Sequence, residues 1–223
     1  MNIKINRGDY VAWVLIAAGF ALGGWFYQSL PDPMPTHFGL DGQPDDYTPL
    51  PWGAFLLPVI SIGVYLLMKL LPVISPREFA MDRFTGAYEA VIVCVLAFMA
   101  FIQYFLLASA VGNHMDLMPW ISVLVGVLFL VIANYITKTQ PNFFFGIRTP
   151  WTLANEEVWF RTHRQGAYLF ALVGIVFILG APFRLGLVVS VVFAVTVAVW
   201  LVIYSYILYV RLDRERSDLS GRS

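Results

Sequence analysis

Six long apolar stretches, separated by polar connections, dominate the hydrophobic pattern of the chain. They cover residues 10–30, 51–71, 87–111, 118–136, 166–182 and 187–209. A helix needs about 20 mostly apolar residues to cross the hydrocarbon core of a membrane, so each stretch is a candidate span. A membrane β-barrel would alternate apolar and polar residues, whereas the run 188–199 does not alternate. The pattern therefore predicts an all-α fold, a polytopic membrane bundle of six transmembrane helices.

The composition agrees with a membrane protein and excludes several other classes. Hydrophobic residues make up 59% of the chain and charged residues 13%, and the mean hydropathy is +0.73. Soluble domains carry about 25% charged residues, so a soluble enzyme, a disordered chain and a basic nucleic-acid-binding domain are excluded. Cys94 is the one cysteine in the sequence, so no disulfide can form within the chain.

The cationic residues gather on one side of the predicted bundle. Of the 14 Lys and Arg residues, only Arg184 falls on the opposite side. Connections rich in Lys and Arg stay in the cytoplasm, which predicts that both termini and connections 72–86 and 137–165 are cytoplasmic. The first connection, residues 31–50, then faces the outside. It is rich in Pro, Gly and Asp and contains neither Lys nor Arg.

The other connections carry further structural predictions. Residues 31–50 are too many for a simple turn, so we expect them to fold over the end of the bundle. Ser75 and Pro76 resemble the start of a short interfacial helix before the third span. The third and fifth connections are short and predict tight helical hairpins. The tail after residue 210 is polar and predicts a frayed end.

The fourth connection combines aromatic and polar residues. Phe143, Phe144, Phe145 and Trp151 lie within nine residues, and a loop of this composition needs a surface to pack against. With Thr152 as a candidate N-cap, residues 153–164 predict an amphipathic helix. We expect this helix to lie at the membrane surface before the chain turns into the fifth span.

These features divide the chain into three parts. Residues 1–86 form an N-terminal two-span unit with the outer Pro/Asp-rich connection. Residues 87–210 form a four-span unit with the cytoplasmic aromatic loop, and residues 211–223 form a cytoplasmic tail.

Polar residues within the spans predict contacts between helices. Lys69 and Glu89 lie near the cytoplasmic ends of spans two and three, and charges at membrane depth usually pair, so we expect them to be neighbours. Gln103 and Asn134 are expected to form hydrogen bonds between helices.

Two motifs in the connections resemble the signatures of the SdpI family. The first connection fits the pattern P-x-H-F/W-x-x-x-G-x-P-D of a small membrane domain of unassigned function, at Pro35, His37, Phe38, Gly42, Pro44 and Asp45. The fourth connection fits the pattern N-x-x-x-G-x-R-x-P-W-x-L, at Asn142, Gly146, Arg148, Pro150, Trp151 and Leu153. Further family positions are matched by Asn134, Trp159, Thr162, His163 and Gly166. The chain departs from the family at Ala133, where Gly is frequent.

The resemblance implies an integral, multi-pass protein of the bacterial inner membrane. The family's namesake protects its cell against a secreted sporulation-delaying-type peptide toxin. It also holds a small winged-helix repressor at the membrane when the toxin is present. We therefore expect an immunity or receptor protein whose partners are the lipid bilayer, a secreted peptide and a cytoplasmic winged-helix repressor. No direct contact with nucleic acid is expected, and an oligomer is compatible with this picture.

Two other functions stay open at this point. The chain could be a small transporter or channel for a peptide or a lipid-like solute, or a passive membrane scaffold. The sequence offers no nucleophile with an adjacent base, so we expect no enzyme, and it indicates no cofactor and no metal. His163 and Glu156 would form an acid–base pair only if the fold brought them together.

Under the immunity hypothesis, the outer connection recognises the peptide and the inner loop is the effector surface. The candidate recognition residues are Pro35, His37, Phe38, Asp41, Gly42, Pro44 and Asp45. The candidate effector residues are Asn134, Asn142, Gly146, Arg148, Pro150, Trp151, Thr152, Trp159 and His163.

Two of these residues have several interpretations. His37 could contribute to recognition, satisfy a turn, or bind a metal with Asp41 or Asp45, although one His with loosely spaced Asp residues is a weak metal signal. Arg148 could stack on an aromatic ring, pair with a lipid phosphate or with Glu156, or snorkel to the interface.

Overall fold

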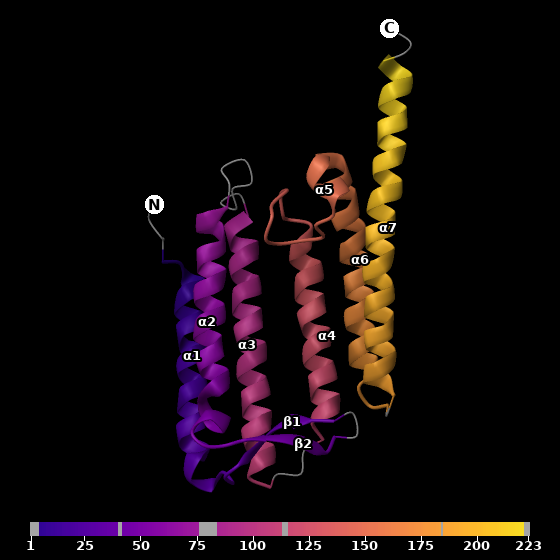
Figure 1. The fold of residues 1–223 in the computed structure, drawn as a ribbon. Helices are drawn as coiled ribbons and strands as arrows, with labels where there is room; N and C mark the ends of the chain where they lie inside the picture. Colours follow the sequence, from indigo (N-terminus) through magenta and orange to yellow (C-terminus); the bar gives the residue numbers. More distant parts are fainter. Residues whose placement is uncertain (1–4, 40–41, 76–83, 113–115, 184, 221–223) are drawn as a thin grey trace.

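Six long helices account for most of the computed structural model, which describes residues 5–39, 42–75, 84–112, 116–183 and 185–220 (Figure 1). They are α1 (Arg7–Phe26), α2 (Trp52–Ile74), α3 (Thr85–Ala110), α4 (Leu117–Ile136), α6 (Glu156–Gly180) and α7 (Gly186–Ser220). Each is long and apolar enough to cross a membrane, α1 together with the short 3-10 helix η1 (Tyr27–Ser29) that follows it. The predicted six-span helical bundle is confirmed, and the chain is a multi-pass membrane protein.

The first connection contains a β-hairpin, which the sequence analysis did not predict. Strand β1 (Met34–Phe38) pairs antiparallel with β2 (Pro44–Thr48). The turn is closed by a hydrogen bond from the Gly39 N–H to the Gln43 carbonyl (2.8 Å), and Gly42 adopts φ +77°. The buried side chain of Met34 ties the start of β1 to the helices. The connection thus folds over the bundle end as expected, but as a hairpin (Figure 1).

The helices form two groups. Helices α1, α2 and α3 pack against one another, and α4, α6 and α7 form a second group joined to the first through α3 and α4. The hairpin lies at one end of the bundle, here called the hairpin end. The start of α1, the end of α7 and the loop 137–149 lie at the opposite end, here called the loop end (Figure 1). The predicted placement of the two motif-bearing connections at opposite ends is confirmed; their assignment to outside and cytoplasm stays a prediction.

Small residues bring α4 and α6 into close contact. A Cβ atom built on Gly126 would lie 2.7 Å from the Gly174 carbonyl oxygen, so neither position has room for a side chain. One turn away, the Ser122 hydroxyl donates to the carbonyl of Phe177 (2.7 Å). Contacts of this kind replace the hydrophobic effect as the source of helix association in lipid.

The predicted surface helix and the predicted fifth span form one continuous helix, so the expected turn between them is wrong. The N-cap is Asn155, whose Oδ1 accepts from the N–H groups of Glu157 (2.9 Å) and Val158 (3.3 Å). Thr152 lies instead within the short helix α5 (Pro150–Ala154). The apolar face of residues 153–164 packs against protein rather than lying on the membrane surface, because Val158 and Trp159 are fully buried.

The tail also differs from the prediction. Helix α7 runs without interruption to Ser220 and projects beyond the other helices at the loop end (Figure 1). The helix predicted to start at Ser75 and Pro76 falls mainly on residues 76–83, outside the described residues.

The three-part division of the chain stays a prediction. A boundary after residue 86 assigns α3 to the second unit, whereas α3 packs mainly against α1. The predicted division therefore places α3 with α4, α6 and α7, whereas the helix packing places it with α1 and α2.

Candidate functional site

Asn142 organises the loop between α4 and α5. Its side chain is fully buried, and its Nδ2 donates to the carbonyls of Gln140 (2.8 Å) and Phe145 (2.9 Å). Its Oδ1 accepts from the N–H groups of Phe144 (2.9 Å) and Phe145 (2.6 Å). One side chain thus makes four hydrogen bonds to backbone groups that lie outside any helix or sheet. These bonds fix the shape of the loop.

His163 and Trp159 on α6 hold the second half of this loop. The two rings stack with centroids 4.0 Å apart, and the Trp159 Nε1 donates to the Thr139 carbonyl (3.1 Å). The His163 Nε2 accepts from the Ile147 N–H (3.0 Å), so its Nδ1 carries the hydrogen and donates to the Trp159 carbonyl (2.8 Å). Both ring nitrogens are therefore occupied, and the conditional acid–base pair with Glu156, an exposed residue, does not form.

Gly146 is required where the loop passes His163. It adopts φ +119°, a conformation that L side chains rarely adopt, and a Cβ atom there would collide with the His163 Nε2. The glycine therefore permits the contact between the loop and the imidazole.

Threonines anchor the end of the loop to α7. Thr149 is the N-cap of α5 and accepts from the Thr152 N–H (3.2 Å), while the Thr152 hydroxyl donates to the Ile147 carbonyl (2.9 Å). The Thr149 and Ser205 hydroxyls are 3.0 Å apart and buried. Pro150 occupies the first helical position of α5, where its missing N–H costs nothing.

Several predicted effector residues lie at the surface or near it, Pro150 among them. The exposed Arg148 donates from Nη1 to the Phe143 carbonyl, a contact within the loop that none of its predicted interpretations included. Trp151 is half-buried and packs on Tyr206 of α7, with ring centroids 5.0 Å apart. Asn134 is exposed, so the predicted hydrogen bond into the bundle is wrong for this residue, whereas buried Gln103 donates to the carbonyls of Gly19 and Ala54.

The aromatic loop, defined here as residues 137–149, also reaches the first helix group. Phe144 and Phe145 pack against the buried cluster formed by residues of α1 and α3 together with Phe84. The Phe145 ring and the Tyr88 ring on α3 form a T-shaped contact, with centroids 6.2 Å apart. The loop therefore starts on α4 and bridges to α3, which gives its aromatic residues the surface that their composition predicted.

The hairpin carries the recognition candidates at the opposite end. His37 Nδ1 and Asp45 Oδ1 lie 2.5 Å apart across the strands, and their side chains are 70% and 52% exposed. Beside this pair, the Thr36 and Thr48 hydroxyls are 2.7 Å apart. The structure thus brings His37 and Asp45 together on an exposed surface.

The remaining recognition candidates flank this pair. Phe38 pairs with Pro44 at the turn end of the hairpin, and Pro35 pairs with Tyr47. Gly42 approaches the second helix group, because its Cβ position lies 3.6 Å from Oδ1 of Asp116, the N-cap of α4. Asp41 lies outside the described residues.

The loop-end charges pair differently from the prediction. Lys69 on α2 forms an ion pair with Asp9 on α1 (2.9 Å), not with Glu89. Asp9 also accepts from the Tyr65 hydroxyl (2.9 Å) and from the Asn6 N–H (2.8 Å). Glu89 accepts instead from the Asn6 side chain. The predicted neighbourhood of Lys69 and Glu89 is therefore wrong.

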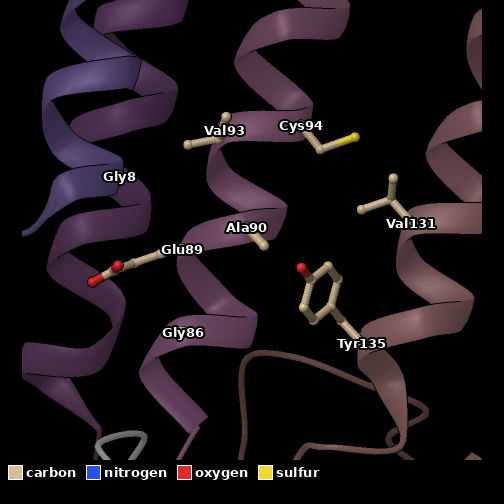
Figure 2. A pocket seen from close by; sticks show the side chains of 8 residues that line it. All are labelled: Gly8, Gly86, Glu89, Ala90, Val93, Cys94, Val131 and Tyr135. Atoms are coloured by element: carbon tan, nitrogen blue, oxygen red, sulfur yellow. The ribbon is translucent and has the colours of Figure 1, made fainter.

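A groove of about 430 Å³ separates the two helix groups near the loop end (Figure 2). It lies between α3 and α4, and most of its lining is apolar. The Tyr135 hydroxyl on α4 points toward Ala90 on α3, Cys94 points toward α4, and the Glu89 carboxylate points away toward Gly8 (Figure 2). The aromatic loop joins the two groups beside this groove.

Two parts of this arrangement were not predicted from the sequence. The first is Asp9, which forms the ion pair with Lys69. Its position was indicated in the sequence by an Asn6–Asp9 capping box at the start of the first span. Ser205, which anchors the loop to α7, has no signal in the sequence, because a serine in an apolar span is common.

Comparisons with known proteins match both motif-bearing regions. Residues 14–62 match the Domain of unknown function (DUF1648), and residues 138–208 match the SdpI/YfhL protein family. Over 215 residues the chain is 23% identical to Immunity protein SdpI of Bacillus subtilis (strain 168). The aligned region covers 94% of this chain and 100% of that protein. No solved structure gives a significant match. The resemblance is confirmed: in this multi-pass bacterial inner-membrane protein, a segment similar to DUF1648 precedes a segment similar to the SdpI/YfhL protein family.

Proposed function

We propose that this chain is an immunity-type membrane protein that protects its cell against a secreted, membrane-active peptide. The match to an immunity protein over its whole length supports protection as the general role. The observation that carries the proposal further is the position of the two motif-bearing segments. The hairpin and the aromatic loop lie at opposite ends of the bundle, and each reaches from one helix group to the other.

The same geometry supports a relay between the two ends. A ligand shifts a conformational equilibrium only if it binds one arrangement better than the other. A peptide on the hairpin would act on both helix groups at once, because the hairpin connects to α2 and approaches Asp116 at the start of α4. A change in the spacing of the groups would reach the loop end at the Phe145–Tyr88 contact. The groove between α3 and α4 leaves room for such a change.

Protection is tested by a toxin challenge. Cells that express the chain are exposed to a sporulation-delaying-type peptide and to peptides encoded beside its gene, and survival is compared with cells that lack it. We expect protection, and we expect the double variant His37→Ala/Asp45→Ala to lose it. The matched control Asp213→Ala/Arg216→Ala removes two exposed charges at the loop end. Equal killing with and without the wild-type chain, for every peptide, would contradict the proposal.

The sidedness of the relay is tested by cysteine labelling. Pro49 beside the hairpin and Glu156 beside α5 are exposed, so each can be replaced by Cys in a Cys94→Ser background. A membrane-impermeant maleimide added to intact cells should label the Pro49→Cys variant and leave Glu156→Cys unlabelled until the cells are opened. Labelling of both sites in intact cells would exclude a message that crosses the membrane.

The proposed effector role concerns a cytoplasmic winged-helix repressor. Its contact surface would include Phe143, which is 40% exposed, and the exposed Arg148. We expect the wild-type chain in peptide-treated membranes to retain such a repressor, and the variant Phe143→Ala to retain less of it. Equal retention with and without peptide would leave immunity in place and remove the relay.

The alternative function, a small transporter or channel, makes a different prediction. Among the described residues, Asp9 is the one buried Asp, Glu, Lys or Arg, and its ion pair lies in the first turn of α1 rather than midway along the bundle. Transport pathways usually carry ionisable groups at membrane depth. Flux of a labelled peptide through proteoliposomes that contain the chain would favour transport over the receptor proposal.

A further inference from the structure

A cavity of about 260 Å³ lies beneath the hairpin, between the strands and the neighbouring ends of α2 and α3. Its polar rim comes from the strands, through Thr36, His37 and Asp46. Its floor comes from the helices and is mainly apolar, through Leu56, Leu57 and Leu106, with Gln103 as its polar member. His37 and Leu56 are both exposed, so the cavity is bordered by residues that solvent or a ligand can reach.

An irregularity in the strands coincides with this cavity. The pairing register shifts on both sides of His37, which is the mark of a β-bulge or a related irregularity. Bulges re-aim side chains and occur frequently beside functional sites. By contrast, the start of β1 packs tightly on α2, because a Cβ atom on Gly53 would lie 3.0 Å from the Cβ of Met34. The hairpin therefore seals one end of the space and leaves a polar rim at the other.

The size of the cavity limits what it can hold. An apolar cavity of about 150 Å³ is large enough for a benzene ring. Sites for drug-sized ligands start at about 300 Å³. A space of about 260 Å³ therefore suits a single aromatic or branched apolar side chain, and it is too small for a folded peptide or a whole solute of that class.

The charge around the rim favours a cationic neighbour for that side chain. Segment 31–50 contains four Asp residues and neither Lys nor Arg. Asp45 is engaged by His37, whereas Asp46 is exposed, lines the cavity, and uses Oδ1 to accept from the Tyr47 N–H. Its second carboxylate oxygen suits a Lys or Arg that flanks an apolar residue. Complementary charge of this kind selects partners and speeds their encounter.

We propose that this cavity is the anchor site for one aromatic or branched apolar side chain of a cationic peptide. The flanking Lys or Arg of the peptide pairs with Asp46 while the apolar side chain enters between α2 and α3. This inference rests on the proposed function, because it names the chemistry of the peptide that the hairpin recognises. The competing occupant, a lipid acyl chain, is an outcome of the experiment below.

The test uses the purified full chain in phosphatidylcholine nanodiscs, whose lipids carry no net charge. The probe is a synthetic amphipathic Lys/Leu peptide with one photo-reactive benzoylphenylalanine on its apolar face. Two control peptides replace that residue by Ala or every Lys by Glu. We expect the probe to bind and to crosslink to residues 53–57 or 103–107, and both control peptides to bind at least tenfold more weakly.

Variants of the chain then separate the cavity from the surrounding surface. Leu57→Trp fills the cavity and should weaken probe binding at least tenfold, and the milder Leu57→Phe should weaken it less. The matched control is Val188→Trp, which places the same side chain in a separate cavity of about 530 Å³ at the hairpin end and should change binding less than twofold. Asp46→Asn should weaken binding about fivefold at low salt and have little effect at 1 M salt, where charges are screened.

Three results would overturn the assignment. They are unchanged binding to well-folded Leu57→Phe and Leu57→Trp, crosslinks confined to other helices, and a photo-reactive phospholipid that labels the cavity while the peptide does not compete. The toxin challenge is scored separately. If the wild type protects and Leu57→Trp protects equally, only the cavity assignment fails. If the wild type does not protect, the proposed function fails, and binding of the probe still decides the chemistry of the cavity.

Discussion

Replacing Asn142 by Ala should release the aromatic loop without unfolding the helices. Two of the four hydrogen bonds of Asn142 protect the N–H groups of Phe144 and Phe145. A hydrogen bond of this type contributes about 1 kcal/mol net, so the loop should lose roughly 2 kcal/mol of local stability through these two bonds alone. Since 1.4 kcal/mol corresponds to a factor of ten, opening of the loop should become about 30-fold more frequent.

Hydrogen–deuterium exchange followed by mass spectrometry measures this effect in detergent or nanodiscs, because local opening sets the exchange rate of protected amides. Peptides covering Phe144 and Phe145 should exchange about 30-fold faster in the variant, and peptides from α1 and α2 should be unchanged. Gln140→Ala is the matched control, since the Gln140 backbone carbonyl still accepts from Asn142. Exchange within twofold of the wild type in Asn142→Ala would refute the role given to this side chain.

Two further predictions concern helix packing. Gly126→Ala should destabilise the chain by about 1–3 kcal/mol in a thermal-shift assay, because the added methyl group overlaps the facing helix. The control Gly63→Ala should not destabilise the chain, because no atom lies within 4 Å of its new Cβ. Equal melting temperatures of Gly126→Ala and the wild type would contradict the close contact between α4 and α6. Asp9→Leu should destabilise by about 2–3 kcal/mol because it leaves Lys69 without its partner, and adding Lys69→Leu should restore most of the loss. If the double variant lost as much stability as the two single variants together, the two residues would not interact.

The spans could be predicted because the membrane imposes a length and an apolar composition on each helix, whatever its neighbours are. The hairpin could not, because Pro44, Asp45 and Asp46 are poor strand formers in isolation. These residues form a strand because Met34 is buried beside α2 and fixes the position of the partner strand.

The contacts that a side chain makes within the fold are harder to predict than the helix or strand to which it belongs. The sequence predicts an apolar face along residues 153–164; Val158, Trp159 and Thr162 are buried, whereas Ala154 is exposed at the end of α5. An amphipathic pattern is the same whether the face covers a membrane surface or a protein loop. The contact of Trp159 with the Thr139 carbonyl depends on where the aromatic loop folds. Lys69 was expected to pair with an acid on α3. It pairs with Asp9, which in the sequence has the signature of an ordinary helix start.

The uninterrupted course of α7 has a consequence for any soluble protein near the loop end. A helix of 35 residues is about 50 Å long, whereas the hydrocarbon core is about 30 Å thick. Roughly 20 Å of α7 therefore extends beyond the membrane into water, and this part of the helix carries Arg and Asp side chains. The Trp151–Tyr206 contact holds α7 against α5, so a soluble protein that approaches α5 also meets the projecting part of α7.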